Sequence, residues 1–557
     1  MLGTKPPTRT GEPSGGIAGT WTDSLDALGV ETQRLPQASH AGKGGAQVDT
    51  TRTSADTPQM EHLNDKILKD GITFDDVLIV PAYSDFTPEN AETGTLLTRS
   101  IALNIPLVSA PMDTVTESAL AIALAQEGGI GIIHKNLSPE RQAREVSRVK
   151  RSENGVISDP ITLGPEDSVA QATSLMVDHG VSGFPVTADG SSRGRVLGIL
   201  TRRDLTFLHG EDSTAPVGEV MTREALVTAP AGTSPAEAEA LMSRGRVEKL
   251  LLVSPDGCLA GLMTMRDLEN VTDHPHACRD ERGRLRVGAA LGPHQFDRAE
   301  SLVNAEVDVL VVDTAHGHSR NVLDTVRELK SNYDIDVIAG NVATPEGALA
   351  LVEAGADAVK VGIGPGSICT TRVVTGIGLP QITAVMDVVA AVDGLGVPVI
   401  ADGGIRMSGD IAKALAAGAS SVMLGSLLAG LDESPGELIL HRGRRFKSYR
   451  GMGSSGAMGA GSADRYGQSG IAETRKFVPE GVEGMVPYRG ELADIVYQMV
   501  GGVRAAMGYC GTPDVASFRR DARFVRISAA SMVESHPHDI TITKEAANYT
   551  SNSRHEG

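Results

Sequence analysis

Cysteine is scarce in this chain of 557 residues, and its four cysteines lie far apart, at Cys258, Cys278, Cys369 and Cys510. So few cysteines cannot cross-link a chain of this length, and none of them form the close pairs that bind zinc. A disulfide scaffold and a structural zinc domain are therefore excluded. Because free thiols persist in a reducing compartment, we expect a cytoplasmic protein.

Long apolar runs are also absent. No run approaches the roughly 18 to 20 residues that cross a bilayer, and the N-terminus lacks a basic start followed by an apolar stretch. We therefore expect neither a membrane span nor secretion. Basic residues are outnumbered, since 51 Lys and Arg face 70 Asp and Glu and leave a net charge of −19. This charge opposes binding to nucleic acid and to anionic membranes.

The N-terminal region has no regular apolar pattern. Residues 1–59 are rich in Gly, Pro, Ser, Thr and Ala and show neither helical nor strand periodicity, although they contain the only tryptophan, Trp21. Such a composition cannot bury enough apolar surface to fold. We predict that residues 1–59 form a disordered tail.

What the sequence does contain, from Thr73 onward, is a series of short apolar runs separated by Ala-rich segments of helical period. The eight runs cover residues 106–112, 129–134, 287–292, 309–313, 337–341, 358–362, 399–402 and 422–425. Uninterrupted apolar strands are typical of a parallel sheet with helices on both faces. The pattern therefore predicts an α/β fold with a TIM (β/α)8 barrel. The long interval after the second run indicates an insertion, which divides the barrel into residues 60–150 and 274–557.

The insertion, residues 151–273, contains an internal repeat. The sequence Gly-Ile-Leu-Thr-Arg-Arg-Asp-Leu at 198–205 recurs as Gly-Leu-Met-Thr-Met-Arg-Asp-Leu at 261–268. Each copy follows an amphipathic helix and a short apolar strand. We expect these helices at 169–180 and 236–245, and the strands at 184–187 and 249–253. Two such units resemble a tandem CBS pair, a module that commonly binds adenine or guanine nucleotides between its halves.

The resemblance to CBS units implies that the Thr and Asp of each Thr-x-x-Asp approach ribose and phosphate. These residues are Thr201 with Asp204, and Thr264 with Asp267. The alternative interpretation is that they only start and cap a helix, which this spacing also suits. The pattern favours neither nucleotide and neither direction of regulation.

The strongest chemical signal is the loop Gly-Ile-Gly-Pro-Gly-Ser-Ile-Cys-Thr-Thr-Arg at 362–372, which follows a predicted barrel strand. Loops at that end of the strands carry the active sites of TIM barrels. The glycines permit positive φ, so backbone groups can converge while Cys369 stays at the rim. A thiolate nucleophile needs such access. Cys369 is therefore a candidate nucleophile, whereas a lone cysteine elsewhere is usually a small buried apolar residue.

Residues 362–381 resemble the catalytic loop of IMP dehydrogenases, and residues 71–81 are similar to the N-terminal signature of that family. The resemblance extends over nearly all of residues 71–550. It implies that Cys369 attacks C2 of the hypoxanthine ring of IMP and that hydride then leaves for NAD⁺. Thr371 matches the family's threonine beside the reacting carbon. The implied activity is the oxidation of IMP to XMP, the committed step of guanine nucleotide synthesis.

Two further Gly-rich turns, at 402–405 and 425–426, follow the last two predicted strands, where TIM barrels commonly hold phosphate. The resemblance assigns Asp402 to the ribose hydroxyls of IMP. It assigns the IMP phosphate to Ser367, Gly404, Gly425, Ser426 and Tyr449. It assigns the purine base to Met452, Gly453 and Glu480.

The dinucleotide needs another site, because no Gly-x-Gly-x-x-Gly follows a strand at the start of a βαβ unit. NAD⁺ must then lie across barrel loops. The segment 312–317 is similar to the family's cofactor loop, which brings Asp313 to the nicotinamide ribose, and we assign Gly362 and Gly364 to the same cofactor. The alternative for Asp313 is a capping carboxylate at the end of a strand.

Residues 451–484, here called the flap, are dominated by Gly, Ser and other small residues. We predict that the flap buries little and is mobile. A plain surface linker is the alternative. The resemblance implies that it closes after NADH departs and that Arg465 and Tyr466 activate water. Because free arginine stays protonated, Arg465 must be desolvated or share this work with Tyr466 or Thr371. Gly467 departs from the family, which often has an aromatic residue there, and this bears on how the closed flap docks.

The resemblance also implies a K⁺ site and an oligomer. Carbonyl oxygens suit K⁺, and the family's ligands match Gly364, Gly366 and Cys369, with Glu534, Ser535 and His536 supplied by a neighbouring subunit. A homotetramer, possibly an octamer, would follow.

Two other functions are compatible with parts of the pattern. A GMP reductase resembles this family in the barrel and its cysteine but uses NADPH, releases ammonia and usually lacks the Arg-Tyr pair, so Arg465 and Tyr466 argue against it. A nucleotide sensor with a vestigial barrel is opposed by the intact set of Cys369, Thr371, Arg465 and Tyr466.

Overall fold

The computed structural model describes residues 66–152, 157, 159–206, 214–471 and 473–549. The predicted disordered tail, residues 1–59 with Trp21, lies outside them. Within the described part of the chain, no helix combines the length and apolar character needed to cross a membrane.

Eight parallel strands close into a barrel, which confirms the predicted TIM-type fold. Their spatial order is β11 (Val287–Leu291), β12 (Val309–Asp313), β13 (Asp336–Val342), β14 (Ala358–Val361), β15 (Val399–Asp402), β16 (Ser421–Leu424), β4 (Leu107–Ser109) and β5 (Ile130–Ile133). All eight coincide with the predicted runs. Only Asp336 and Asp402 in these strands are partly exposed, as expected of strands that are covered on both faces.

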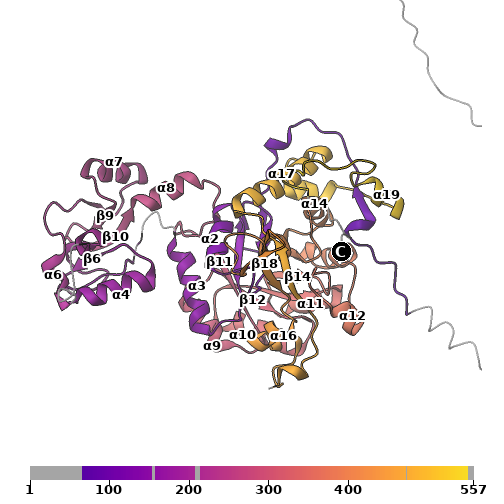
Figure 1. The fold of residues 1–557 in the computed structure, drawn as a ribbon, viewed down its shortest axis with the longest axis horizontal. Coiled ribbons are helices and arrows are strands. Elements are labelled where there is room, and N and C mark those ends of the chain that lie inside the picture. The colour runs from indigo at the N-terminus through magenta and orange to yellow at the C-terminus, as the bar shows by residue number, and fades with distance from the viewer. Residues whose placement is uncertain (1–65, 153–156, 158, 207–213, 472, 550–557) are drawn as a thin grey trace, which may run out of the picture. The chain divides into compact units, whose positions relative to one another are not determined.

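Helices surround the barrel strands (Figure 1). They are α2 (Ser118–Gln126), α3 (Pro139–Ser152), α9 (Phe296–Asn304), α10 (Arg320–Asn332), α11 (Pro345–Glu353), α13 (Gln381–Val392), α14 (Ser408–Ala416) and α15 (Ser426–Ala429). Helix α10 illustrates why they pack there, because Val322, Val326 and Leu329 recur on one face and are buried. The short helix α12 (Thr371–Thr375) follows the candidate catalytic loop.

The flap connects two paired strands. An antiparallel sheet contains β17 (Leu438–His441), β18 (Arg444–Arg450) and β19 (Glu483–Pro487), and Arg450 pairs with Glu483. The chain between them forms α16 (Ser455–Ala460), η5 (Ser462–Tyr466) and η6 (Thr474–Lys476). The prediction that the flap buries little is wrong for its first half, because Ala457, Met458 and Ser462 are buried. Small side chains let this backbone pack closely.

The remaining elements of the barrel part lie near the chain ends, except η4, which directly follows α13. They are η1 (Phe74–Asp76), β1 (Val77–Ile79), η2 (Pro88–Asn90), β2 (Thr95–Leu96), β3 (Ala102–Leu103), η4 (Asp393–Leu395), α17 (Leu492–Cys510), α18 (Val515–Asp521), β20 (Phe524–Arg526) and α19 (Ala529–Glu534). Strand β1 pairs with β20, so residues 77–79 and 524–526, far apart in the sequence, lie side by side.

The inserted residues form two similar units. The first contains α4 (Val169–His179), β6 (Gly183–Thr187), β7 (Val196–Thr201), α5 (Arg202–Leu205) and α6 (Val217–Val220). The second contains β8 (Thr228–Pro230), α7 (Pro235–Gly245), β9 (Lys249–Val253), β10 (Leu259–Thr264) and α8 (Met265–Asp273). Helices α4 and α7 and strands β6 and β9 lie where the repeat predicts them. Each unit has its own apolar core, one around Phe184 and the other around Met242.

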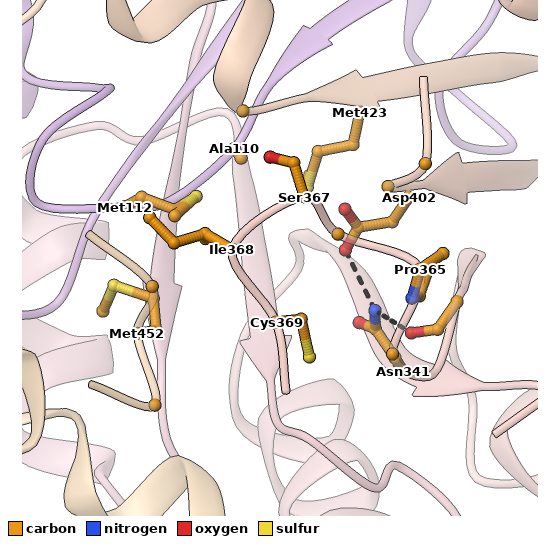
Figure 2. Close-up of a pocket in the computed structure, with 18 of the residues that line it drawn as sticks. Ala110, Met112, Asn341, Pro365, Ser367, Ile368, Cys369, Asp402, Met423 and Met452 are labelled. Carbon is orange, nitrogen blue, oxygen red and sulfur yellow. Dashed lines mark hydrogen bonds between the residues drawn. The ribbon is translucent and has the colours of Figure 1, made fainter. Parts of the chain in front are cut away.

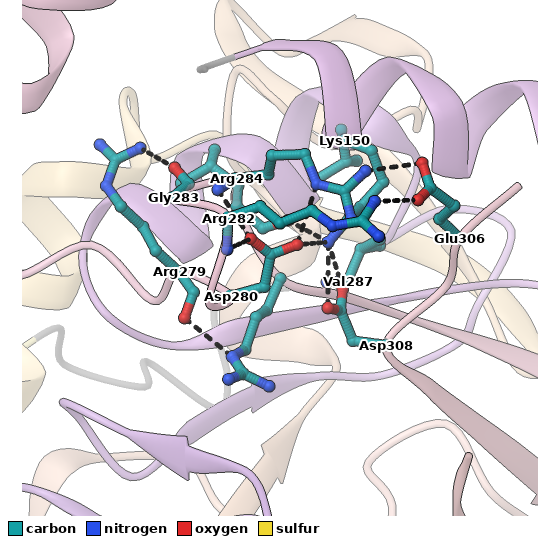
Figure 3. A network of polar contacts seen from close by, with 12 residues as sticks. Lys150, Arg279, Asp280, Arg282, Gly283, Arg284, Val287, Glu306 and Asp308 are labelled. Atoms are coloured by element: carbon teal, nitrogen blue, oxygen red, sulfur yellow. Dashed lines mark hydrogen bonds and ion pairs between the residues drawn. The ribbon is translucent and has the colours of Figure 1, made fainter. Parts of the chain in front are cut away.

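A buried lysine ties together the segments that flank the insertion (Figure 3). Lys150, near the end of α3, donates to Asp280 and Asp308 at 2.9 Å and to the carbonyl oxygen of Leu285 at 3.1 Å. Asp308 also accepts from the backbone of Val287 at 2.8 Å. Burial raises the pKa of Asp308, although Lys150 opposes this shift. The network therefore anchors both segments at the amino ends of β11 and β12.

Candidate active site

A cavity of about 190 Å³ lies at the carboxyl ends of the barrel strands. Its lining includes every residue that the sequence analysis assigned to catalysis, to IMP or to NAD⁺. Figure 2 shows the Cys369 sulfur and the Asp402 carboxylate among the side chains that surround the cavity. Three sources contribute this lining: the loops after the strands, the sheet of β17 to β19, and the flap.

The loop after β14 holds Cys369 at the cavity. The Cys369 sulfur lies 3.1 Å from the Thr371 hydroxyl, and the Cys369 amide donates to the carbonyl oxygen of Gly366 at 3.1 Å. The loop also pairs with the returning end of the flap, because the Thr370 amide donates to the Glu480 carbonyl oxygen at 2.9 Å. Cys369 is half-buried, so its sulfur is positioned and still accessible from the cavity.

Gly362 is required where this loop begins. Its φ is +151°, and a Cβ atom there would collide with the carbonyl oxygen of Asp402. The absence of a side chain thus lets the catalytic loop and the end of β15 approach each other.

A buried lysine, Lys360, organises the polar side of the cavity. Its ammonium donates to Asp402 at 2.7 Å and to Asp313 at 2.9 Å, and it also contacts Asn341. The Asn341 amide donates to Asp402 at 2.9 Å and to the Gly362 carbonyl oxygen at 2.7 Å (Figure 2). The Lys360 side chain is only 1% exposed. From β14, it therefore fixes two carboxylates, one at the end of β12 and the other at the end of β15.

Lys360 and Asn341 were not predicted from the sequence. Lys360 carried a usable signal, because a lysine interrupts the otherwise apolar strand β14 and a buried charge requires partners. Asn341 ends a predicted apolar run and had no comparable signal.

Arg465 of the flap forms an ion pair with Asp313. Its carbonyl oxygen accepts from the Ala315 amide at 3.0 Å, which joins the flap backbone to the loop after β12. Tyr466 is half-buried. Loss of solvent around its phenol raises the pKa of Tyr466, although Arg465 opposes the shift. Asp313 is therefore more than a strand-end cap, because it pairs with both Lys360 and Arg465.

The residues assigned to phosphate also line this cavity. Burial raises the pKa of Tyr449 to about 12, against the effect of a hydrogen bond with Ser367, so the phenol stays protonated at neutral pH. Gly404 has a φ of +81°, and a Cβ atom there would approach the Phe74 ring to 3.2 Å. Gly425 and Ser426 begin α15 at the same side.

The family follows from comparison with known proteins. The model of the IMP dehydrogenase / GMP reductase domain matches residues 71–538. This chain belongs to that family.

Two similar proteins are inosine-5'-monophosphate dehydrogenases. The inosine-5'-monophosphate dehydrogenase of Rhodopirellula baltica is 59% identical over 489 residues, which cover 87% of this chain and 90% of the relative. That of Aquifex aeolicus is 56% identical, with coverage of 87% and 99%. A crystal structure of GMP reductase from Trypanosoma brucei in complex with guanosine 5'-monophosphate superimposes with a TM-score of 0.76 at 40% identity, covering 86% of this chain and 100% of that chain.

The residues assigned to K⁺ lie in two parts of this chain. Gly364, Gly366 and Cys369 share the catalytic loop and line the cavity. Glu534, Ser535 and His536 lie at the end of α19, where His536 lines a different hollow with Asp75 and Asp76. In the described part of the chain, no group of His, Cys, Asp and Glu could hold a metal ion through side chains.

In the inserted units, Thr201 and Asp204 both cap a helix and line a cavity. The backbone amide and the hydroxyl of Thr201 each donate to Asp204 at 2.7 Å, and Asp204 also accepts from Thr222 at 3.0 Å. The cavity, of about 390 Å³, is also lined by Arg246 and Lys249. The two interpretations of the Thr-x-x-Asp pattern are thus compatible here. Asp267 in the second unit lies outside the residues whose side chains are described.

Proposed function

We propose that this chain is an NAD-dependent IMP dehydrogenase that oxidises IMP to XMP through a covalent bond to Cys369. The observation that carries the proposal is the position of the Cys369 sulfur, beside Thr371 and in the same cavity as Arg465 and Tyr466. The nucleophile Cys369 and the candidate base Arg465 thus line the same cavity. Covalent catalysis divides a difficult oxidation into two easier steps.

In the first step, the Cys369 thiolate adds to C2 of the purine and hydride leaves that carbon. The chemistry that bound NAD⁺ supplies is acceptance of this hydride. In the second step, water adds to the same carbon, the carbon–sulfur bond breaks, and XMP and the thiolate are released. The water proton passes to the Arg465 and Tyr466 pair, for which Thr371 is a candidate relay.

The polar residues of the cavity have distinct proposed roles toward IMP. Asp402, held by Lys360 and Asn341, accepts hydrogen bonds from the ribose hydroxyls. Tyr449 donates to the phosphate together with Ser367, Gly404, Gly425 and Ser426. Met452, Gly453 and Glu480 contact the base. All of these residues line the one cavity, which supports the set as a whole.

Asp313 has two proposed partners. A carboxylate at a strand end suits the hydroxyls of the nicotinamide ribose, and Gly362 and Gly364 leave room beside it. In the present conformation Asp313 binds Arg465 of the flap. We therefore infer that the dinucleotide and the closed flap compete for this carboxylate, which separates the two steps in time.

Four finer assignments belong to the same proposal. K⁺ binds carbonyl oxygens of Gly364, Gly366 and Cys369 together with Glu534, Ser535 and His536 of a neighbouring subunit in a tetramer or octamer. Residues 151–273 bind adenine or guanine nucleotides as a CBS pair, with the barrel formed by 60–150 and 274–557. A cytoplasmic location would keep Cys369 reduced, since all four cysteines are free thiols.

GMP reductase is the second candidate, because the solved trypanosomal GMP reductase is 40% identical and its whole length is covered. The Arg465–Asp313 ion pair argues against it, since a reductase has no hydrolytic step for the flap to serve. Incubation with IMP and NAD⁺, or with GMP and NADPH, followed at the absorbance of the reduced nicotinamide, separates the two. NADH formation from IMP that Cys369→Ala abolishes supports the dehydrogenase, and consumption of NADPH with GMP alone would reject it.

A further inference from the structure

The carboxylate of Asp464, next to Arg465 in the flap, is bound by two residues of the barrel. Lys135, which follows β5, forms an ion pair with one of its oxygens. Gln295, which precedes α9, donates from its side-chain amide to the other oxygen at 2.9 Å. Lys135 and Gln295 do not line the catalytic cavity. Their contact with the flap therefore has a role other than binding the substrate.

We propose that Lys135 and Gln295 form a latch that binds Asp464 and holds the flap closed while water attacks the Cys369-bound purine. This inference rests on the proposed function. The latch residues are positioning residues, since they act on the reaction only through the placement of Arg465.

A hydrogen bond within the barrel orients Gln295 of the latch. The Gly292 amide donates to the side-chain carbonyl oxygen of Gln295 at 3.1 Å. This bond orients the side-chain amide nitrogen of Gln295 toward Asp464. Gln295 thus presents a donor in a fixed direction, and little side-chain entropy is lost when the carboxylate binds.

Gly292 leaves the space that the carboxylate occupies. A Cβ atom at this position would collide with the Asp464 carboxylate and would lie 3.0 Å from both the Lys135 ammonium and the Gln295 amide nitrogen. Gly292 does not adopt the positive φ that would itself require glycine. The absence of a side chain at 292 therefore serves the contact with the flap and not the backbone of the barrel.

The charges around Lys135 favour closure. Burial lowers the pKa of Lys135 to about 8, the nearby Arg465 and Arg298 lower it further, and Asp464 opposes the shift. The Lys135 side chain is only 2% exposed. A buried ammonium without a counter-ion is unfavourable. In the closed flap Asp464 supplies that counter-ion, so the ion pair stabilises the flap at this point.

Adjacent residues couple the latch to the active site. Asp464 and Arg465 both belong to η5, so fixing the Asp464 carboxylate places Arg465 where it reaches Asp313. The dinucleotide is proposed to need Asp313 as well. The latch therefore favours the closed flap over NAD⁺ in the competition for this carboxylate. Loss of the latch should slow hydrolysis and strengthen the binding of NAD⁺ to the covalent intermediate.

The test compares Lys135→Met and Gly292→Ala with the unchanged protein in IMP and NAD⁺. The rate of the first NADH burst should be unchanged, and steady-state turnover should fall between about tenfold and about a hundredfold, the range for loss of a hydrogen bond to a charged group. Mass spectrometry after acid quench should show the Cys369-bound purine accumulating, and excess NAD⁺ should inhibit at lower concentration. Steady-state turnover of the double variant Lys135→Met with Asp464→Asn should be no slower than that of the slower single variant, because both changes remove the same ion pair.

Gly292→Ala retains every charged group, so it tests the latch even if Lys135→Met fails to fold. Gly409→Ala is the matched control, since a Cβ atom at 409 meets nothing within 4 Å. Turnover equal to that of the unchanged protein in both variants, or a burst that slows in parallel with turnover, would overturn the latch alone. Absence of any NADH from the unchanged protein would instead overturn the proposed function and the latch with it.

Discussion

Arg465 of the flap and Asp313 at the end of β12 form an ion pair, and the same Asp313 accepts a hydrogen bond from the buried Lys360. One carboxylate thus connects the fixed polar centre of the barrel to the segment proposed to move. Arg465→Ala should therefore preserve the NADH burst, because hydride transfer precedes flap closure. Turnover should fall by at least about a hundredfold, the range for loss of a general base.

Stopped-flow absorbance separates burst from turnover for this variant. Lys476→Ala provides the control within the same segment, since Lys476 is exposed and pairs only with Glu473 in the described contacts. A burst that disappears together with turnover would contradict a separate role for the flap.

Lys360→Met should impair both binding and stability. The variant leaves the buried Asp313 and the partly exposed Asp402 without their shared cation. Removing one partner of a buried pair costs about 3 to 5 kcal/mol. The melting temperature should fall, and the KM for IMP should rise because Asp402 loses its orientation. Lys330→Met is the control, because it removes a lysine that is 28% exposed and pairs with Asp357 away from the cavity. The KM for IMP should be unchanged in this control. An unchanged KM for IMP in Lys360→Met would reject the role given to Asp402.

The thiols should differ sharply in reactivity. Burial raises the pKa of Cys278 to about 12, and burial also raises the pKa of Cys510. A raised thiol pKa leaves less thiolate, so at pH 8 Cys278 is ionised to only about one part in ten thousand. Iodoacetamide at pH 8 should modify Cys369, IMP should protect it, and Cys278 should remain unmodified. Peptide mapping measures each site, and protection by IMP at a site other than Cys369 would count against the proposed nucleophile.

The barrel was predictable because its strands are buried on both faces and therefore appear as uninterrupted apolar runs. Asp402, which ends one run, and Cys369, in the loop after another, were predictable for the same reason, since carboxyl strand ends converge at one face. The resemblance to a known family supplied the remaining assignments in the cavity, including those in the flap.

Contacts between distant segments were not predictable from local pattern. Lys135 follows β5 and Gln295 precedes α9, and only the closed barrel brings both to Asp464 of the flap. The burial of Ala457 and Ser462 was missed because small residues indicate flexibility in isolation, yet they also permit close packing against a preformed surface.

Gly467, where the family often has an aromatic residue, ends η5 in the left-handed conformation with a φ of +68°. A Cβ atom at this position meets nothing within 4 Å, so the cost of a side chain is conformational and not steric. For an L-residue that cost is about 1 to 2 kcal/mol, or a factor of about 5 to 30 in an equilibrium. Gly467→Ala should lower the population of the closed flap and slow hydrolysis by that factor, with hydride transfer unchanged.

Gly470→Ala is the matched control for this prediction, because Gly470 has open space around it and is not among the glycines with positive φ. Single-turnover release of XMP measures the hydrolytic step for both variants. Gly467→Phe distinguishes strain from docking: if it hydrolyses faster than Gly467→Ala, an aromatic side chain contributes contacts to the closed flap that offset the strained backbone. If Gly467→Phe hydrolyses faster than the unchanged protein, these contacts outweigh the strain. The glycine at position 467 then weakens flap closure in this chain.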